Sequence, residues 1–202
     1  NTIIKTVNGG DTWSVLTTSA ATALNTVYFF NATTGIFSGY GQIFRTTDGG
    51  KTLTSVAGGT TVNYSNLLSL FFINERRGWS AGTNGRVLNT IDGGLTWAAQ
   101  TSNTTNRLNS VVFTDSINGF VYGDSGTRLV TTNGGTTWTA SKVMNNHINS
   151  TFFINVNKGW GVTESNSDST TIYKTIDGGK TWSPYWTGSD RALTSVTFVD
   201  SL

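Results

Sequence analysis

Acidic and basic side chains that could act on a ligand are few in this sequence, because charged residues make up only 12% of it. Cleavage of a glycosidic bond needs two carboxyl groups about 5 to 10 Å apart. The carboxylates that could form such a pair are Asp124, Glu164 and Asp168. A glycoside hydrolase is therefore an alternative function, but the pair is weakly specified and we predict no catalytic residue.

A second set of side chains suits binding better than catalysis. Guanidinium groups bind carboxylates through two parallel hydrogen bonds, and aromatic rings stack on sugars or on protein side chains. The stretch from Ser183 to Trp186 holds the single proline and a tryptophan without a counterpart in the rest of the repeat pattern. The ligand-binding residues predicted in this way are Arg86, Arg107, Arg128, Arg191, Asp124, Tyr185 and Trp186.

Metal and cofactor chemistry is not expected. The sequence has no cysteine, and its one histidine, His147, has no second histidine to share a zinc ion. A calcium site takes several carboxylates, whereas the loop around Asp168 offers only that residue and Glu164. We predict no metal and no cofactor, and we expect His147 to be an ordinary exposed loop residue.

The overall composition argues against two classes of partner. Thirteen basic residues against eleven acidic ones leave a net charge of +2, which provides no basic stripe for a phosphate backbone. The longest apolar run, residues 67–73, contains Ser69 and is far shorter than the roughly 18 residues of a membrane-spanning helix. We expect neither nucleic acid binding nor membrane insertion. Few charges and many Thr, Ser and Asn residues are typical of a secreted β protein.

The candidate residues must be positioned by a repeated unit. A phrase of the form Thr-x-Asp/Asn-Gly-Gly-x-Thr-Trp occurs five times, once with Leu in place of Trp. Its first glycines, 40, 44, 41 and 44 residues apart, are Gly9, Gly49, Gly93, Gly134 and Gly178. This period is too long for a leucine-rich repeat and fits the four strands of one β-propeller blade.

Each interval between two phrases predicts the same strands. An alternating apolar run comes first, as in residues 108–113, and a glycine with a large apolar residue, as in Gly119-Phe120, opens the second strand. A third strand enters the phrase and a fourth follows its Trp, with Asp/Asn-Gly-Gly supplying the positive φ of a tight hairpin. We predict an all-β fold, a β-propeller of four-stranded antiparallel blades of about 42 residues.

The phrase has a structural interpretation of its own. Its carboxylate or amide can accept backbone N–H groups in the turn, its threonine can cross-link the hairpin, and its Trp can fill the seam between blades. The residues assigned to this role are Asn8, Asp48, Asp92, Asn133, Asp177, Trp13, Trp97, Trp138 and Trp182.

The phrase resembles the Asp-box, or bacterial neuraminidase repeat, of sialidases, xyloglucan-cleaving hydrolases, sortilin-type receptors and photosystem II assembly and stability factors. The wider pattern of residues 71–97, with Phe-Phe-Ile-Asn, Gly-Trp and Gly-Thr-Asn-Gly-Arg-Val-Leu before the box, is most similar to the assembly-factor repeats of secreted bacterial proteins. The resemblance implies that the boxes lie on the periphery, away from the ligand-binding face. A sialidase would also need a tyrosine beside a glutamate, and neither Glu75 nor Glu164 has one in the repeat register.

The chain is predicted to be a single propeller domain, or a fragment of one, over residues 1–202. Four complete blades are expected at residues 18–58, 59–102, 103–142 and 143–187, with partial blades at 1–17 and 188–202. Two closures stay open. One is a longer ring of about six to eight blades, and the other is a five-bladed ring whose last blade would lack its second strand.

In such a propeller the loops from second to third strand and from blade to blade lie opposite the boxes, and most charged candidates fall on those loops. We predict a non-catalytic binding or display module of a secreted or cell-surface bacterial protein. It would recognise protein or glycan on the loop face and be attached to further domains or to a larger assembly. A second alternative is an assembly factor that grips its partner through one patch made of Arg86, Arg107, Arg128 and Arg191.

Overall fold

The computed structural model describes residues 2–16, 23–56, 65–164, 170–188 and 193–198, and for Glu164 the backbone only. These residues form antiparallel β-strands joined by turns and short 3₁₀ segments. No helix among them is long and apolar enough to cross a membrane. The described strands make up four four-stranded sheets and one two-stranded hairpin. Strands are adjacent in chain order within every sheet, as the repeat predicts for a blade.

The hairpin consists of β1 (Ile3–Lys5) and β2 (Ser14–Leu16). The first blade contains β3 (Leu24–Phe29), β4 (Gly35–Gly39), β5 (Ile43–Thr46) and β6 (Thr54–Ser55). The second contains β7 (Leu67–Phe72), β8 (Gly78–Gly82), η2 (Thr83–Gly85), β9 (Val87–Thr90) and β10 (Ala98–Gln100). The third contains β11 (Leu108–Phe113), β12 (Gly119–Gly123), η3 (Asp124–Gly126), β13 (Thr127–Thr131) and β14 (Thr139–Lys142). The fourth contains β15 (His147–Phe153), β16 (Gly159–Glu164), β17 (Thr170–Thr175) and β18 (Ser183–Gly188).

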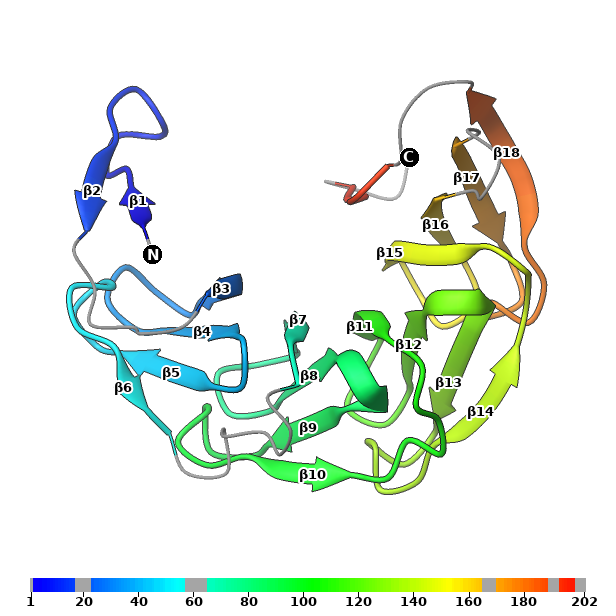
Figure 1. Cartoon of the computed structure of the whole chain (residues 1–202), viewed down its shortest axis with the longest axis horizontal. Helices are drawn as coiled ribbons and strands as arrows, with labels where there is room; N and C mark the ends of the chain where they lie inside the picture. The colour runs from blue at the N-terminus through cyan, green and yellow to red at the C-terminus, as the bar shows by residue number, and fades with distance from the viewer. Residues whose placement is uncertain (1, 17–22, 57–64, 165–169, 189–192, 199–202) are drawn as a thin grey trace.

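The blades follow one another along an arc (Figure 1). The first strand of each blade lies on the inside of the arc and the fourth strand on the outside. The hairpin β1–β2 and the blade β15–β18 lie at the two ends, apart from each other. The described residues therefore do not close a five-bladed ring.

Polar side chains of the first strands join neighbouring blades. The pairing of β11 with β12 shifts register at Asn109, which donates from Nδ2 to the carbonyl O of Ile148 in the next blade at 3.0 Å. The adjacent Ser110 Oγ accepts the backbone N–H of Thr151 at 3.1 Å. Equivalent asparagine bonds run from Asn25 to Leu67 and from Asn149 to Leu193. Each blade is thus fastened to the next along the inside of the arc.

Residues 193–198 lie against the fourth blade in the place of a further first strand. The carbonyl O of Leu193 accepts Nδ2 of Asn149 at 2.8 Å, and the N–H of Val196 donates to Ser150 Oγ at 3.2 Å. The ring of Phe198 lies 4.4 Å from that of Trp160, centroid to centroid. Interior first strands make the same contacts, so this segment continues the repeat.

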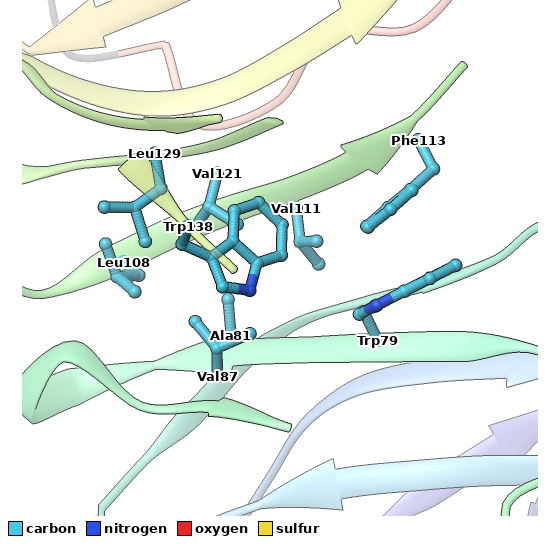
Figure 2. Close-up of a cluster of buried hydrophobic side chains, with 9 residues drawn as sticks. All are labelled: Trp79, Ala81, Val87, Leu108, Val111, Phe113, Val121, Leu129 and Trp138. Carbon is cyan, nitrogen blue, oxygen red and sulfur yellow. The ribbon is translucent and has the colours of Figure 1, made fainter. Parts of the chain in front are cut away.

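The hydrophobic core lies between blades. Figure 2 shows the cluster between the second and third blades, where Trp79 and Phe113 stack with ring centroids 3.4 Å apart. The box residue Trp138 points into this cluster, is 4% exposed and donates from Nε1 to Oε1 of Gln100 at 3.0 Å. Trp97 and Trp182 lie in the equivalent clusters of the neighbouring seams. Trp13 precedes the first seam of the described arc and is 58% exposed.

Threonines on both sides of the carboxylate hold the Asp-box turn. In the second blade, Asp92 Oδ1 accepts the hydroxyl of Thr90 at 2.8 Å and the N–H of Thr96 at 2.9 Å. Asp92 Oδ2 accepts the hydroxyl of Thr96 at 2.6 Å. Thr90 Oγ1 in turn accepts the N–H of Gly94 at 2.9 Å. The carboxylate is therefore committed to the turn and is occupied by structural contacts.

The same turn forms with an amide in place of the carboxylate. Asn133 Oδ1 accepts the N–H of Thr137 at 3.0 Å, and its Nδ2 donates to Thr137 Oγ1 at 2.8 Å. In the carboxylate copies the hydrogen bonds favour the charged form. The hydroxyl of Thr181, with the backbone N–H of the same residue, lowers the pKa of Asp177 to about 2.

Candidate functional site

A cavity of about 690 Å³ lies on the inside of the arc. Its walls come from β3, β7, β11, β15 and the segment at 193–198. Most of its lining side chains are amides and hydroxyls, namely Asn25, Thr26, Ser69, Asn109, Ser110, Asn149, Ser150, Thr194 and Ser195. Such a surface offers many hydrogen-bond donors and acceptors and little net charge.

Four polar side chains from two neighbouring blades meet at one wall of this cavity. Arg107 donates from Nε to Asn109 Oδ1 at 2.9 Å, and Asn109 donates from Nδ2 to Asp124 Oδ1 at 3.0 Å. His147 Nδ1 lies 3.1 Å from the same oxygen of Asp124. All four residues line the cavity. Arg107, Asn109, Asp124 and His147 are termed the channel cluster below.

The repeat explains why these residues meet. Arg107 immediately precedes β11 and His147 begins β15, so the two occupy equivalent positions in successive blades. Asn109 occupies the register shift of β11, and its amide reaches the next blade from there. Asp124 begins η3, the turn between β12 and β13. One side chain of the cluster is therefore contributed by each of the blade-to-blade, first-strand and second-to-third-strand positions, with the fourth from the next blade.

The channel cluster is suited to binding a polar ligand. Arg107 is exposed, and its Nε is held by Asn109, so the planar guanidinium is oriented before a ligand arrives. The side chains of Asp124 and His147 are 32% and 33% exposed, so a ligand can reach both. Asp124 is the only carboxylate among the described residues that line the cavity. These residues therefore do not form the carboxylate pair that glycosidic cleavage requires.

Arg128 lies in a seam between blades and away from the loop face. Its side chain is 9% exposed, and Nη2 donates to the carbonyl O of Gly178 in the fourth blade at 2.7 Å. The guanidinium carbon also lies 5.6 Å from the centroid of the Phe120 ring. The predicted binding role of Arg128 requires an accessible side chain, and this position does not provide one.

The other predicted residues of the arginine patch do not join Arg107. Arg86 follows η2, does not line the cavity, and has a buried Nε without a hydrogen-bond partner in the described part of the chain. Arg191 and Asp168 lie outside the described residues, as does the side chain of Glu164. The described arginines therefore form no single patch of the kind expected for gripping a partner.

Tyr185 and Trp186 lie on β18, the outermost strand of the fourth blade, and are 68% and 51% exposed. Trp186 pairs with Ile172 in the sheet, at the register position that Gln100 occupies in the second blade. Gln100 contacts the Trp of the following blade. By register, Trp186 thus faces the side on which a following blade packs, far along the sheet from the channel cluster.

His147 is the cluster member that sequence reasoning misses. The sequence predicts an ordinary exposed loop histidine, whereas the structure places His147 in the cavity wall beside Asp124. Repeat register is the signal that identifies it. His147 precedes Ile148 as Arg107 precedes Leu108, so a cavity position for one implies a cavity position for the other.

Comparison with known proteins places these observations in a family. A model of the family described as photosynthesis system II assembly factor YCF48 matches residues 59–190. No curated protein sequence matches the chain. A structure described as YCF48 bound to D1 peptide is similar, with a TM-score of 0.68 and 18% identity, over 89% of this chain and 58% of that one.

Two further structures extend the comparison. YCF48 from Cyanidioschyzon merolae has a TM-score of 0.67 and 17% identity, over 91% of this chain and 66% of that one. The GH74 enzyme of Niastella koreensis has a TM-score of 0.60 and 19% identity, over 80% of this chain and 30% of that one. At such identities the likeness is one of fold. It confirms the predicted all-β propeller of four-stranded blades, and this chain spans less than two thirds of either YCF48 structure.

Proposed function

Since the chain belongs to the photosynthesis system II assembly factor YCF48 family, we propose that it is a non-catalytic module that binds a polypeptide segment of a partner protein. The proposed site is the cavity inside the arc, with the channel cluster in its wall. The observation that carries the proposal is the linkage of Arg107, Asp124 and His147 through Asn109 at a cavity of about 690 Å³. That volume lies within the range of ordinary ligand sites.

The chemistry of the cavity supports a peptide as the ligand class. Every peptide residue other than proline brings one N–H and one C=O group, which match the amides and hydroxyls of the first strands. Charged side chains or termini of the segment can pair with Arg107 and with Asp124. A YCF48 structure described as bound to D1 peptide provides a precedent for this class of ligand on this fold. Glycans are the competing class that the sequence also predicts.

Binding without catalysis is proposed because the site is short of catalytic groups. Among the described residues that line the cavity, Asp124 is the only carboxylate, and His147 lies beside it with no serine or threonine within its printed contacts. Glycoside hydrolysis by the common mechanisms uses a pair of carboxyl groups. The likeness to GH74 enzymes extends to the fold and supports no transfer of their activity.

A ligand screen with matched variants tests this proposal. The purified chain would be panned against a peptide display library and applied in parallel to a glycan array. We expect peptide ligands, and we expect them to bind Asp124→Ala/His147→Ala at least about tenfold more weakly, a loss of roughly 1.4 kcal/mol. Circular dichroism and thermal melting of the variant would show that it is folded.

Glu75→Gln is the matched control for this experiment. Glu75 is exposed in the turn between β7 and β8, beside Arg76, whose carbonyl O accepts the N–H of the box residue Gly93. The control therefore removes a carboxylate charge on the box side and should leave peptide affinity unchanged. Ligands that bind the double variant as tightly as the wild type would contradict the proposed site, and glycan hits without peptide hits would contradict the ligand class.

A location outside the cytoplasm, at the surface of a bacterial cell or secreted from it, is a further proposal that only the composition supports. A protein with 12% charged residues and no cysteine tolerates an extracellular medium without disulfide chemistry. Fractionation of the source cells, followed by immunoblotting, would test it.

A further inference from the structure

Strand β1 has a free edge. Among the described residues β1 pairs only with β2, whereas the equivalent strands β5, β9, β13 and β17 each pair with two neighbours. In those blades the second neighbour is the second strand, which opens with glycine and a large apolar residue. An unpaired strand edge presents backbone N–H and C=O groups that can accept another strand.

An apolar cavity lies beside this edge. Its volume is about 330 Å³, and its lining includes Ile3 of β1, Val27 and Phe29 of β3, and Phe37 of β4. Val27 is 53% exposed and Phe29 is 39% exposed. Exposed apolar side chains that adjoin a hollow and a free strand edge are typical of an interaction surface.

The interior seams show what fills the equivalent place. Phe29 closes β3 as Phe72, Phe113 and Phe153 close or nearly close their own first strands. Phe113 stacks on Trp79 of the preceding blade, with ring centroids 3.4 Å apart, and Phe153 stacks on Phe120 at 4.7 Å. Trp79 and Phe120 are the large residues that follow the opening glycine of the second strand.

Burial distinguishes the filled seams from the open one. The interior phenylalanines Phe72, Phe113 and Phe153 are 5%, 4% and 8% exposed, against 39% for Phe29. Phe29 has its own neighbours on the first blade, such as Phe37 at 5.6 Å between ring centroids. What it lacks among the described residues is the large side chain from a preceding second strand.

We propose that the edge of β1 and the cavity beside it bind an extended polypeptide segment as an added strand, antiparallel to β1. The segment carries glycine followed by a large apolar residue, which enters the cavity against Phe29 and Phe37. Residues 119–123, Gly-Phe-Val-Tyr-Gly, are an example of this pattern within the chain itself. Backbone bonds to β1 provide part of the affinity and the apolar residue provides the specificity, as in other cases of strand addition.

A synthetic peptide with the sequence of residues 116–124, blocked at both ends, is the probe for this proposal. Its fluorescently labelled form would be titrated with the full chain, and binding followed by anisotropy. We expect saturable binding, a raised Tm of the complex, and binding roughly tenfold weaker for the peptide with serine in place of its phenylalanine. Amide exchange of β1 should slow only with the unaltered peptide.

Two variants of the protein make the test specific. Val27→Glu places a charge in the cavity and should abolish binding, whereas Val15→Glu changes an exposed valine of β2 that does not line the cavity and should have no effect. Equal binding of both peptides, or undiminished binding to Val27→Glu, would overturn the proposal. So would the absence of binding to the wild-type chain while its melting curve shows a folded protein.

Discussion

Arg128 of the third blade donates from Nη2 to the carbonyl O of Gly178, 2.7 Å away in the box turn of the fourth blade. Lys5 of the hairpin β1–β2 makes the same kind of bond to the box of the first blade, with Nζ 3.1 Å from the carbonyl O of Gly49. In both cases a cation of the preceding sheet binds the first glycine of the following box. The Asp-box therefore fastens a blade to its neighbour in addition to closing its own hairpin.

The first prediction is that Arg128→Met lowers the free energy of unfolding by about 1 to 3 kcal/mol, because the carbonyl O of Gly178 loses a charged donor in a buried seam. Methionine keeps much of the apolar contact with Phe120, so the change reports mainly on the hydrogen bond. Urea unfolding would measure it. Arg107→Met, at an exposed arginine, should change stability by less than about 0.5 kcal/mol; equal effects of the two variants would contradict the role given to Arg128.

The second prediction concerns the box carboxylate. Asp92→Ala removes the acceptor of the Thr90 and Thr96 hydroxyls and of the Thr96 N–H, so it should lower the free energy of unfolding by roughly 1 to 3 kcal/mol. Asp92→Asn should cost much less near neutral pH, since Asn133 holds the same turn with an amide. Denaturant titrations of the two variants would separate these effects. A loss of stability as large for Asn as for Ala would show that the charge, and not the hydrogen-bond geometry, holds the turn.

The third prediction is a loss of stability in acid. Hydrogen bonds from Thr52 and from Thr181 hold the pKa of Asp48 and of Asp177 at about 2 in the folded chain, below the ordinary value of 3.8. A depressed folded pKa adds stability that is present above the unfolded pKa and disappears as the pH falls through the folded pKa. The free energy of unfolding should thus decline between about pH 4 and pH 2.

Asp177→Asn provides the control for the acid effect, because an amide at this position cannot titrate. Unfolding would be measured at several values of pH for the wild type and the variant. The decline below pH 4 should be shallower in Asp177→Asn. Identical slopes would mean that the box carboxylates do not cause the acid sensitivity.

The fourth prediction compares two box glycines with positive φ. Gly9 has a φ of +72° and open space around it, so Gly9→Ala should cost only the conformational penalty, about 1 kcal/mol. Gly94 has a φ of +79°, and a Cβ there would lie 2.5 Å from Cδ1 of Ile36 in the preceding blade. Gly94→Ala should therefore cost clearly more than Gly9→Ala, with thermal melting as the measurement. Similar losses would mean that the seam yields easily at Ile36.

Much of the fold follows from the sequence because the repeat is written in residues with strong local preferences. The pair Gly93-Gly94 can adopt positive φ at little cost, and the alternating apolar residues of 108–113 form a strand with one buried side. Five copies in one register also reveal the blade period. Local preference and period together predict the sheets, the turns between third and fourth strands and the order of strands in each blade.

The candidate site was harder to predict, because its residues act across blades. Arg128 precedes an apolar strand in the sequence, yet the position it occupies faces the following blade, where it finds the Gly178 carbonyl. His147 carries no distinguishing neighbours in the sequence, and its contact with Asp124 depends on how two blades are placed beside each other. Such contacts are set by inter-blade packing, for which the local sequence has no signal other than register.

Amide hydrogen exchange of the chain with and without a peptide selected from the library tests the central claim most directly. The account predicts slowed exchange in β11, in β15 and in the turn that begins at Asp124, where the channel cluster lies, and unchanged exchange in the box turns such as residues 133–137. Protection confined to the box turns or to the outer strands, with β11 and β15 unchanged, would contradict the proposal that the inside of the arc binds the partner.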